Sequence, residues 1–288
     1  MKSSELLKKL SFSRPEQSLY LLAIAFVVVA LAALWIDLRL GIAVLVLFSA
    51  ASYALNIILA TKQNGSLWKS FRQLEAFQQL FYFVSPRLPL PPTRLGAASP
   101  DLLLLLCKEV LSTTPRFVVE CGAGISTLVM GYLLEKNGQG QMVTLEHDPV
   151  WAERVARWVT EHQLDAHVKV VYAPLVEQSV AGKTYTWYDA AVYQPLVATH
   201  AIDLLFIDGP PDYVHPDARF PALAFLRPYL SPRCVIVMDD TERQDEAKAA
   251  RIWAEELDYQ LELLAHLEKG AGVLRPRFTS TIQEQPTP

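Results

Sequence analysis

Acidic residues end a series of apolar runs in the second half of the chain. They are Glu120, Glu146, Asp208 and the adjacent pair Asp239 and Asp240. A carboxylate can pair with an ammonium group, accept hydrogen bonds from hydroxyl groups or remove a proton from a reacting group. One such residue is usually a helix cap or part of a solvated loop. Four positions in succession favour a binding site built from carboxylates.

A glycine turn follows the first of these acids, in the stretch FVVECGAGISTLVM. Its residues Gly122-Ala123-Gly124 allow a ligand to approach the backbone without meeting a Cβ atom. A dinucleotide site would need a further glycine where Thr127 stands. Glu120 is also unfavourable beside a pyrophosphate but suits an ammonium group. Glu146, 22 residues after Gly124, is placed to accept hydrogen bonds from both hydroxyls of a ribose.

The elements that must position these residues alternate between strand and helix from Ser99 onward. Strand patterns cover 116–121, 140–148, 167–173, 201–209 and 234–240, and helix patterns cover 101–111, 126–137, 149–164, 220–230 and 241–257. Such alternation predicts an α/β fold, a doubly wound and mostly parallel sheet whose faces are covered by helices. Ligands bind at the carboxyl ends of the strands in such sheets.

The motifs VVECGAGIST, TLEHD and LLFIDG, in this order, resemble the class I S-adenosylmethionine-dependent methyltransferases over roughly Ser99 to Leu274. The resemblance implies a Rossmann-like fold, with Glu120 on the methionine ammonium group and Glu146 on the ribose. The cofactor-binding residues that we expect are Glu120, Gly122, Gly124, Ser126, Thr127, Glu146 and Ala173. Ala173 is included because the segment VYAPL lacks the acid that many relatives place beside adenine, so that backbone groups and apolar contacts would hold the base.

Asp208, Asp239 and Asp240 are expected at the ends of two adjacent strands. This arrangement resembles the catechol-type, cation-dependent O-methyltransferases, and it implies that the three carboxylates hold a divalent ion such as Mg²⁺. A bound cation lowers the pKa of an acceptor hydroxyl. In the alternative interpretation, Asp208 orients the substrate or loop amides, while Asp239 or Asp240 caps the next helix.

One departure from that family lies just after Asp208. The relatives carry a lysine there, whereas this chain has Pro210 and Pro211. Asp212 and His215 are the nearest replacements, and His215 is either a general base or a loop histidine without a role. We therefore count Asp208, Asp212 and His215 as the candidate catalytic residues.

Two uncharged apolar segments, 18–36 and 40–60, are each long enough to cross a bilayer core of about 30 Å. Three residues join them, which predicts a transmembrane hairpin. Lys and Arg residues flank its outer ends, which predicts that both termini and the catalytic domain are cytoplasmic, at a bacterial inner membrane. A cleaved signal peptide is a weaker interpretation, because the first run is too long and a second follows at once.

Residues 66–84 show helical apolar spacing, and this amphipathic helix either lies on the membrane or packs on the following domain. Four prolines between 86 and 92 indicate an extended linker, and Ser99 and Pro100 are typical of a helix start. The predicted organisation is an N-terminal segment (1–17), the hairpin (18–60), the helix and linker (61–98), a methyltransferase domain (99–275) and a disordered tail (276–288).

Composition limits the partners and leaves three functions to compare. The net charge of −4 and the lack of a basic stripe argue against nucleic acid, and three dispersed cysteines match neither disulfide nor zinc spacing. We expect an S-adenosylmethionine-dependent methyltransferase that O-methylates a small-molecule, glycan or lipid-linked acceptor at the membrane face. The alternatives are a non-catalytic membrane scaffold with a degenerate cofactor fold, and aminopropyl transfer on a similar fold.

Overall fold

The computed structural model describes residues 24–29, 31–32, 35, 37–94, 96–180, 182–215 and 217–277. The chain divides into two compact units, 1–68 and 69–288. The predicted N-terminal segment 1–17 and the tail beyond residue 277 lie outside the described residues. The first predicted membrane span is described only in part.

Helix α3 (Leu38–Phe83) contains the second predicted membrane span. Asp37 starts it, because its carboxylate accepts hydrogen bonds from the backbone N–H groups of Arg39 at 2.6 Å and Leu40 at 3.3 Å. Within the described part of the chain, α3 is the one helix long and apolar enough to cross a membrane, a criterion of length and composition alone. Phe26, in the helical residues 24–29, stacks on Phe48 with ring centroids 3.6 Å apart. The complete two-helix hairpin stays a prediction.

Helix α3 also continues through Gly65 to Phe83, whereas the sequence patterns placed a membrane span and an amphipathic helix there as separate elements. A glycine inside a helix costs only about 1 kcal/mol, and no proline lies between Leu38 and Phe83, so nothing forces a break. The end of α3 packs on the domain that follows. Leu80 and Val84 are buried in its core, which confirms the packing alternative for this part of the helix.

The central sheet has seven strands in the order β3-β2-β1-β6-β7-β9-β8. Its parallel strands pair along β3-β2-β1-β6-β7, with a register shift between β6 and β7 at Ile202–Leu204, and β9 and β8 add antiparallel strands at one edge. This confirms the predicted α/β class with a mostly parallel sheet. The strands are β1 (Phe117–Cys121), β2 (Gln141–Glu146), β3 (Val168–Tyr172), β6 (Ile202–Ile207), β7 (Leu230–Asp239), β8 (Tyr259–Leu263) and β9 (Ala271–Pro276).

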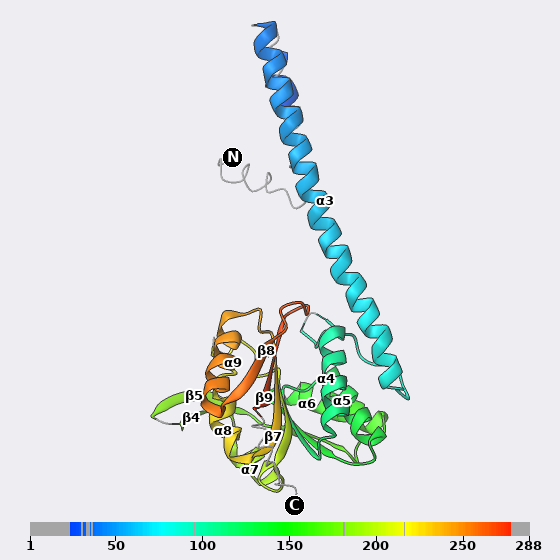
Figure 1. The fold of residues 1–288 in the computed structure, drawn as a ribbon, viewed down its shortest axis with the longest axis vertical. Coiled ribbons are helices and arrows are strands. Elements are labelled where there is room, and N and C mark those ends of the chain that lie inside the picture. The colour runs from blue at the N-terminus through cyan, green and yellow to red at the C-terminus, as the bar shows by residue number, and fades with distance from the viewer. Residues whose placement is uncertain are drawn as a thin grey trace, which may run out of the picture. The chain divides into compact units, whose positions relative to one another are not determined.

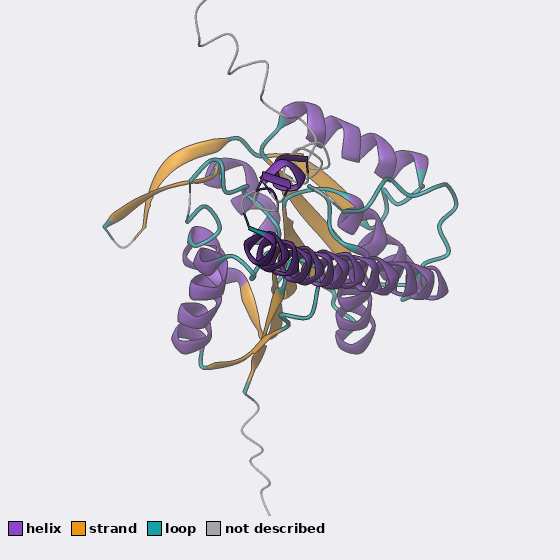
Figure 2. Ribbon diagram, turned by 90° about the horizontal axis from the view of Figure 1, so that it is seen from above, coloured by secondary structure: helices purple, strands orange, loops and turns teal. Residues whose placement is uncertain are grey.

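Helices cover both faces of this sheet (Figures 1 and 2). Successive residues of a strand face opposite sides, so Val118 of β1 joins one buried cluster and Val119 joins the other. The helices are α4 (Pro100–Thr113), α5 (Ile125–Lys136), α6 (Pro149–Glu161), α7 (Ala190–Val197), α8 (Pro221–Leu226), the 3-10 turn η1 (Arg227–Tyr229) and α9 (Gln244–Leu257). Ser99 precedes α4 at its N-cap position, as predicted.

A two-stranded hairpin projects from the domain beside the main sheet (Figure 1). It consists of β4 (Leu175–Val180) and β5 (Lys183–Tyr188), and the sequence patterns did not predict it. Its strands carry many polar residues on both faces, so neither the buried-strand pattern nor a clean alternation marks it. It matters for the site because β5 delivers Tyr188 to the carboxyl edge of the sheet.

Candidate functional site

A cavity of about 380 Å³ opens at the carboxyl ends of β1, β2 and β6, and we call it the strand-end hollow. Its volume lies in the range of about 300–1,000 Å³ that is usual for small-molecule sites. A cavity of about 400 Å³ between α3, α4 and β8 includes none of the strand-end acids. The strand-end hollow is therefore the candidate site, and its walls include Gly122, Ala123, Glu146, Trp151, Tyr188 and Asp208.

The two glycines of the turn after β1 have different structural roles. Gly122 has φ +95°, and a Cβ atom on it would lie 3.0 Å from the carbonyl carbon of Asp208 and from the nitrogen of Gly209. The close approach of the ends of β1 and β6 therefore requires this glycine. Gly124 is extended, with φ −177°, and an added Cβ would meet only Ser126 Oγ at 4.0 Å. Nothing in the protein itself requires a glycine at Gly124.

Glu146 lies in the wall of the strand-end hollow, as the sequence predicted. Its Oε2 accepts a hydrogen bond from the N–H of Ala123 at 3.0 Å, and its Oε1 accepts one from the N–H of Asp148 at 2.9 Å. His147 Nδ1 lies 2.8 Å from the same Oε1. These contacts fix the carboxylate between the β1 turn and the β2 loop. A carboxylate has about four acceptor positions, so Glu146 can still accept hydrogen bonds from a ligand.

Glu120 is placed differently from our expectation. It is fully buried, and its carboxylate accepts hydrogen bonds from Ser126 Oγ at 2.6 Å, Thr127 Oγ1 at 2.5 Å and Thr144 Oγ1 at 2.8 Å. Burial raises the pKa of Glu120 to about 7, although the three hydroxyl hydrogen bonds oppose that shift. Because side chains alternate along β1, Glu120 shares the face of Val118, under α5, and does not line the hollow.

The expectation that Glu120, Ser126 and Thr127 face a ligand is therefore wrong for their side chains. Together they form a polar cluster behind the turn, and Thr127 Oγ1 also accepts a hydrogen bond from the N–H of Gly124 at 3.0 Å. This cluster fixes the first turn of α5. The cluster therefore acts on the hollow indirectly, by holding the glycine turn 122–124 in its observed conformation.

Ala173 is also outside the hollow, because it is buried and its N–H donates to the Glu146 carbonyl at 2.8 Å. Trp151, in the first turn of α6, lines the hollow. Its indole Nε1 donates to the Ala123 carbonyl at 2.7 Å, which ties α6 to the glycine turn. The available signal was its position in the first turn of the helix that follows Glu146.

The three aspartates at the ends of β6 and β7 meet as predicted. One carboxylate oxygen from each of Asp208, Asp239 and Asp240 lies within 4.8 Å of the others. Burial and the neighbouring Asp239 raise the pKa of Asp208, and burial and the neighbouring Asp240 raise that of Asp239. Neither Asp239 nor Asp240 caps α9, whose N-cap position is occupied by Arg243 without a side-chain cap. The capping alternative is therefore wrong.

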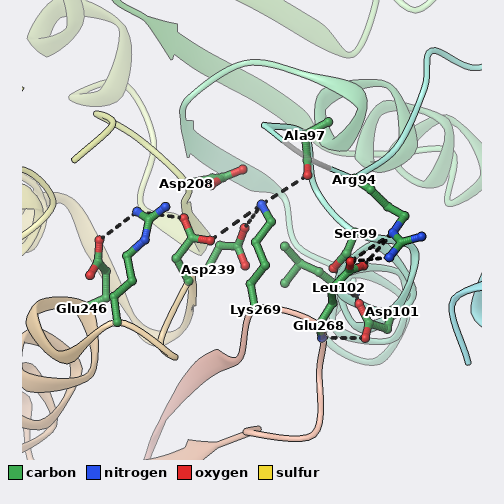
Figure 3. A network of polar contacts seen from close by, with 12 residues as sticks. Arg94, Ala97, Ser99, Asp101, Leu102, Asp208, Asp239, Glu246, Glu268 and Lys269 are labelled. Carbon is green, nitrogen blue, oxygen red and sulfur yellow. Dashed lines mark hydrogen bonds and ion pairs between the residues drawn. The ribbon is translucent and has the colours of Figure 1, made fainter. Parts of the chain in front are cut away.

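Two cations that the sequence analysis did not single out lie within this acidic cluster. Arg219 Nη2 lies 3.2 Å from Asp208 Oδ1 and 2.7 Å from Asp240 Oδ2. Lys269 Nζ lies 3.5 Å from Asp239 Oδ2 and 3.6 Å from Asp240 Oδ1. Figure 3 shows Lys269 reaching toward Asp239 from the loop between β8 and β9.

The acidic cluster has the right ligand chemistry for Mg²⁺, which prefers oxygen atoms. However, each of the three carboxylates already contacts a cationic side chain of the protein. The residues present therefore do not fit the divalent ion that the resemblance implied.

The other two catalytic candidates, Asp212 and His215, are not among the residues that line the strand-end hollow. Asp212 pairs with Arg243 at 3.4 Å, and its side chain is 52% exposed. The Nδ1 atom of His215 accepts a hydrogen bond from the N–H of Asp217 at 3.1 Å, and His215 lines a separate cavity of about 290 Å³ beside β5. The structure does not bring Asp212 or His215 to Asp208, so the prediction that they replace a lysine there is wrong.

Tyr188, at the end of β5, is a hollow-lining residue that the sequence analysis missed. Its hydroxyl is buried and has no hydrogen-bond partner among the described residues. It lies 2.7 Å from the position that a Cβ atom on Gly209 would occupy. A buried donor without a protein partner is costly, and an ordered water or a bound molecule usually completes the hydrogen bonding of such a group.

Comparison with known proteins identifies the domain that carries this site. Residues 119–241 match a protein family described as "Methyltransferase domain". No curated protein matches the chain. This match covers the glycine turn, Glu146 and the three strand-end aspartates, and it supports a methyltransferase domain in this part of the chain.

Several solved structures are similar to the chain at low identity. An SAH-bound methyltransferase of Podospora anserina is 15% identical, with a TM-score of 0.48, 76% of this chain covered and 96% of that one. An O-methyltransferase of Bacillus cereus in complex with SAH is 16% identical, with a TM-score of 0.44 and coverages of 70% and 90%. An SAM-bound O-methyltransferase of Streptomyces achromogenes, involved in tomaymycin synthesis, is 17% identical, with a TM-score of 0.41 and coverages of 71% and 88%.

Proposed function

We propose that the chain binds S-adenosylmethionine in the strand-end hollow and O-methylates a small acceptor there. One observation carries this proposal. The glycine turn and Glu146 form one wall of a single hollow, Asp208 lies in that same hollow, and all of them fall inside residues 119–241. The cofactor would supply a methyl group activated by a positively charged sulfur, so the chain needs mainly to align an acceptor with it.

Each wall of the hollow has a distinct task in this proposal. Glu146 accepts hydrogen bonds from the ribose hydroxyls, and the Trp151 ring provides apolar contact for the base in place of Ala173. Gly124 leaves room for the ligand to pass the backbone at the start of α5, where unpaired N–H groups attract an anionic group. Asp208 is the group that orients the acceptor hydroxyl or removes its proton, because it is the candidate base that lines the hollow.

The membrane location belongs to the same proposal. The apolar first half of α3, together with the uncharged residues before it, would anchor the enzyme, with the domain on the cytoplasmic side where the cofactor is made. A glycan or lipid-linked acceptor would suit an enzyme held at that surface. Carbonate extraction of membranes tests the anchor, and release of the full chain into the soluble fraction would contradict it.

Binding of S-adenosylhomocysteine to the detergent-solubilised full chain tests the proposed function. Calorimetry should show saturable binding to the unaltered protein and a loss of at least about tenfold in affinity for Glu146→Ala, because hydrogen bonds to a charged group contribute about 1.5–3 kcal/mol. Glu153→Ala is the matched control, since Glu153 is an exposed residue of α6 outside the hollow. Absence of binding in the unaltered protein would instead favour the non-catalytic scaffold.

A further inference from the structure

We propose that Arg219 and Lys269 neutralise the acidic cluster of Asp208, Asp239 and Asp240 from within the chain, and that methyl transfer at this site needs no divalent ion. The inference deepens the proposed function and rests on it, because it concerns how the same hollow handles charge. It departs from what the catechol-type resemblance implied for these three residues.

Arg219 is held in the cluster by several bonds at once. Its Nη1 donates to the Asp239 carbonyl at 3.0 Å, and its Nη2 donates to the Asp208 carbonyl at 3.0 Å and to Asp240 Oδ2 at 2.7 Å. The side chain is almost fully buried. A guanidinium held this way cannot leave when another cation arrives, so Arg219 is a permanent part of the cluster.

Lys269 reaches the cluster from the loop between β8 and β9, and neighbouring residues hold this loop in place. Its Nζ donates to the Ala97 carbonyl at 3.2 Å and lies 3.5 Å from Asp239 Oδ2. The preceding residue, Glu268, pairs with Arg94 through both carboxylate oxygens and donates its N–H to Asp101 Oδ2 at 2.9 Å. Figure 3 shows these contacts as one continuous network. The ammonium group is thus positioned by the segment before α4 and not by a chance surface contact.

The charges of this cluster leave little attraction for a metal ion. Three carboxylates carry −3, and Arg219 and Lys269 carry +2, which leaves −1. Arg243 also touches Asp240 at 3.2 Å, but it is shared with Asp212 at 3.4 Å and Glu246 at 3.5 Å. A divalent ion would compete for the same oxygen atoms and would lie beside two fixed positive charges. The chain therefore supplies the compensating charge itself.

Manganese binding, followed by electron paramagnetic resonance on the detergent-solubilised full chain, tests the proposal. The unaltered protein should bind no Mn²⁺ more tightly than about 1 mM. Lys269→Met removes one fixed positive charge and should raise the Mn²⁺ affinity by about tenfold or more. The matched control is Lys248→Met, an exposed lysine of α9, which should leave the affinity unchanged. Lys269→Arg keeps the charge and should also stay free of Mn²⁺.

Two results would overturn the proposal. One is tight Mn²⁺ binding by the unaltered protein that disappears in Asp239→Asn, and the other is a Lys269→Met variant that gains no affinity. Calorimetry with S-adenosylhomocysteine on the same samples separates this question from the proposed function. If the unaltered protein does not bind S-adenosylhomocysteine, the proposed cofactor site is rejected. The Mn²⁺ affinities test only whether Arg219 and Lys269 neutralise the acidic cluster.

Discussion

The two glycines of the turn after β1 should respond differently to replacement by alanine. Gly122→Ala should lower the stability of the fold, whereas Gly124→Ala should lower the affinity for the ligand. In Gly122→Ala the new Cβ lies 3.0 Å from the backbone of Asp208 and Gly209, at a φ of +95°. The left-handed backbone costs about 1–2 kcal/mol and overpacking about 1–3 kcal/mol, so unfolding should become easier by about 2–5 kcal/mol. For a unit of this size, that corresponds to a melting temperature lower by about 4–20 °C.

Gly124→Ala is the matched substitution two residues further along the turn. Its Cβ meets only Ser126 Oγ at 4.0 Å, and the extended backbone accepts alanine without strain. Stability should stay the same or rise by about 0.4–1 kcal/mol, because alanine restricts the unfolded chain. The affinity for S-adenosylhomocysteine should fall, since the methyl group occupies space that we assign to the ligand.

Thermal unfolding of the full chain in detergent, followed by tryptophan fluorescence with and without S-adenosylhomocysteine, separates the two effects. A Gly122→Ala variant as stable as the unaltered protein would refute the argument from close approach of β1 and β6. A Gly124→Ala variant that binds the ligand normally would refute the role assigned to the free space at Gly124.

Three further predictions concern single side chains. The pKa of Glu120 is raised from 4.5 to about 7, so the folded state binds a proton more tightly than the unfolded state, and stability should fall as the pH rises from about 4.5 to about 7. In urea unfolding at pH 4 and pH 8, Glu120→Gln should remove roughly 3 kcal/mol of that decline, and an unchanged decline would contradict the assignment. Tyr188→Phe removes a buried hydroxyl without a partner, so the free energy of unfolding of the ligand-free protein should rise by about 1 kcal/mol. The rise in melting temperature on adding the ligand should become smaller. A less stable variant would show that the hydroxyl already has a hydrogen-bond partner. Leu80→Ala should lower the free energy of unfolding by about 2–5 kcal/mol, because Leu80 is fully buried. Leu74→Ala, at an exposed position of the same helix, should change it by less than about 0.5 kcal/mol. Equal effects of the two substitutions would argue against packing of the end of α3 on the domain.

The sequence predicted the strands of the parallel sheet well, because each is a short apolar run flanked by turn residues. It missed the β4–β5 hairpin, whose strands are largely polar, and the β8–β9 pair, in which β8 is mostly exposed and β9 is short, contains Gly272 and ends at Pro276. The joined helix α3 was also missed, because the change from the apolar segment 40–60 to the amphipathic segment 66–84 suggested two separate elements. These elements depend on pairing and packing partners far away in the chain.

The candidate site likewise contains residues that the sequence could place and residues that it could not. Glu146 and Asp208 could be placed from the sequence, because a residue at the carboxyl end of a parallel strand has a fixed position at the edge of the sheet. Glu120 was placed on the wrong side, since its position two residues before a glycine does not show which face of β1 it occupies. Arg219 and Lys269 come from loops that reach the acids only after folding, and no local pattern marks them.

The position of β9 has a consequence for how the domain is completed during synthesis. It follows β8 in the chain but lies between β7 and β8 in the sheet, and Lys269 lies two residues before it. Until these residues have been added, β7 has an unpaired edge, and Asp239 at its end and the following Asp240 lack the ammonium group. Open edges favour pairing between chains. A released chain that ends before residue 269 should for that reason aggregate more readily than the full chain.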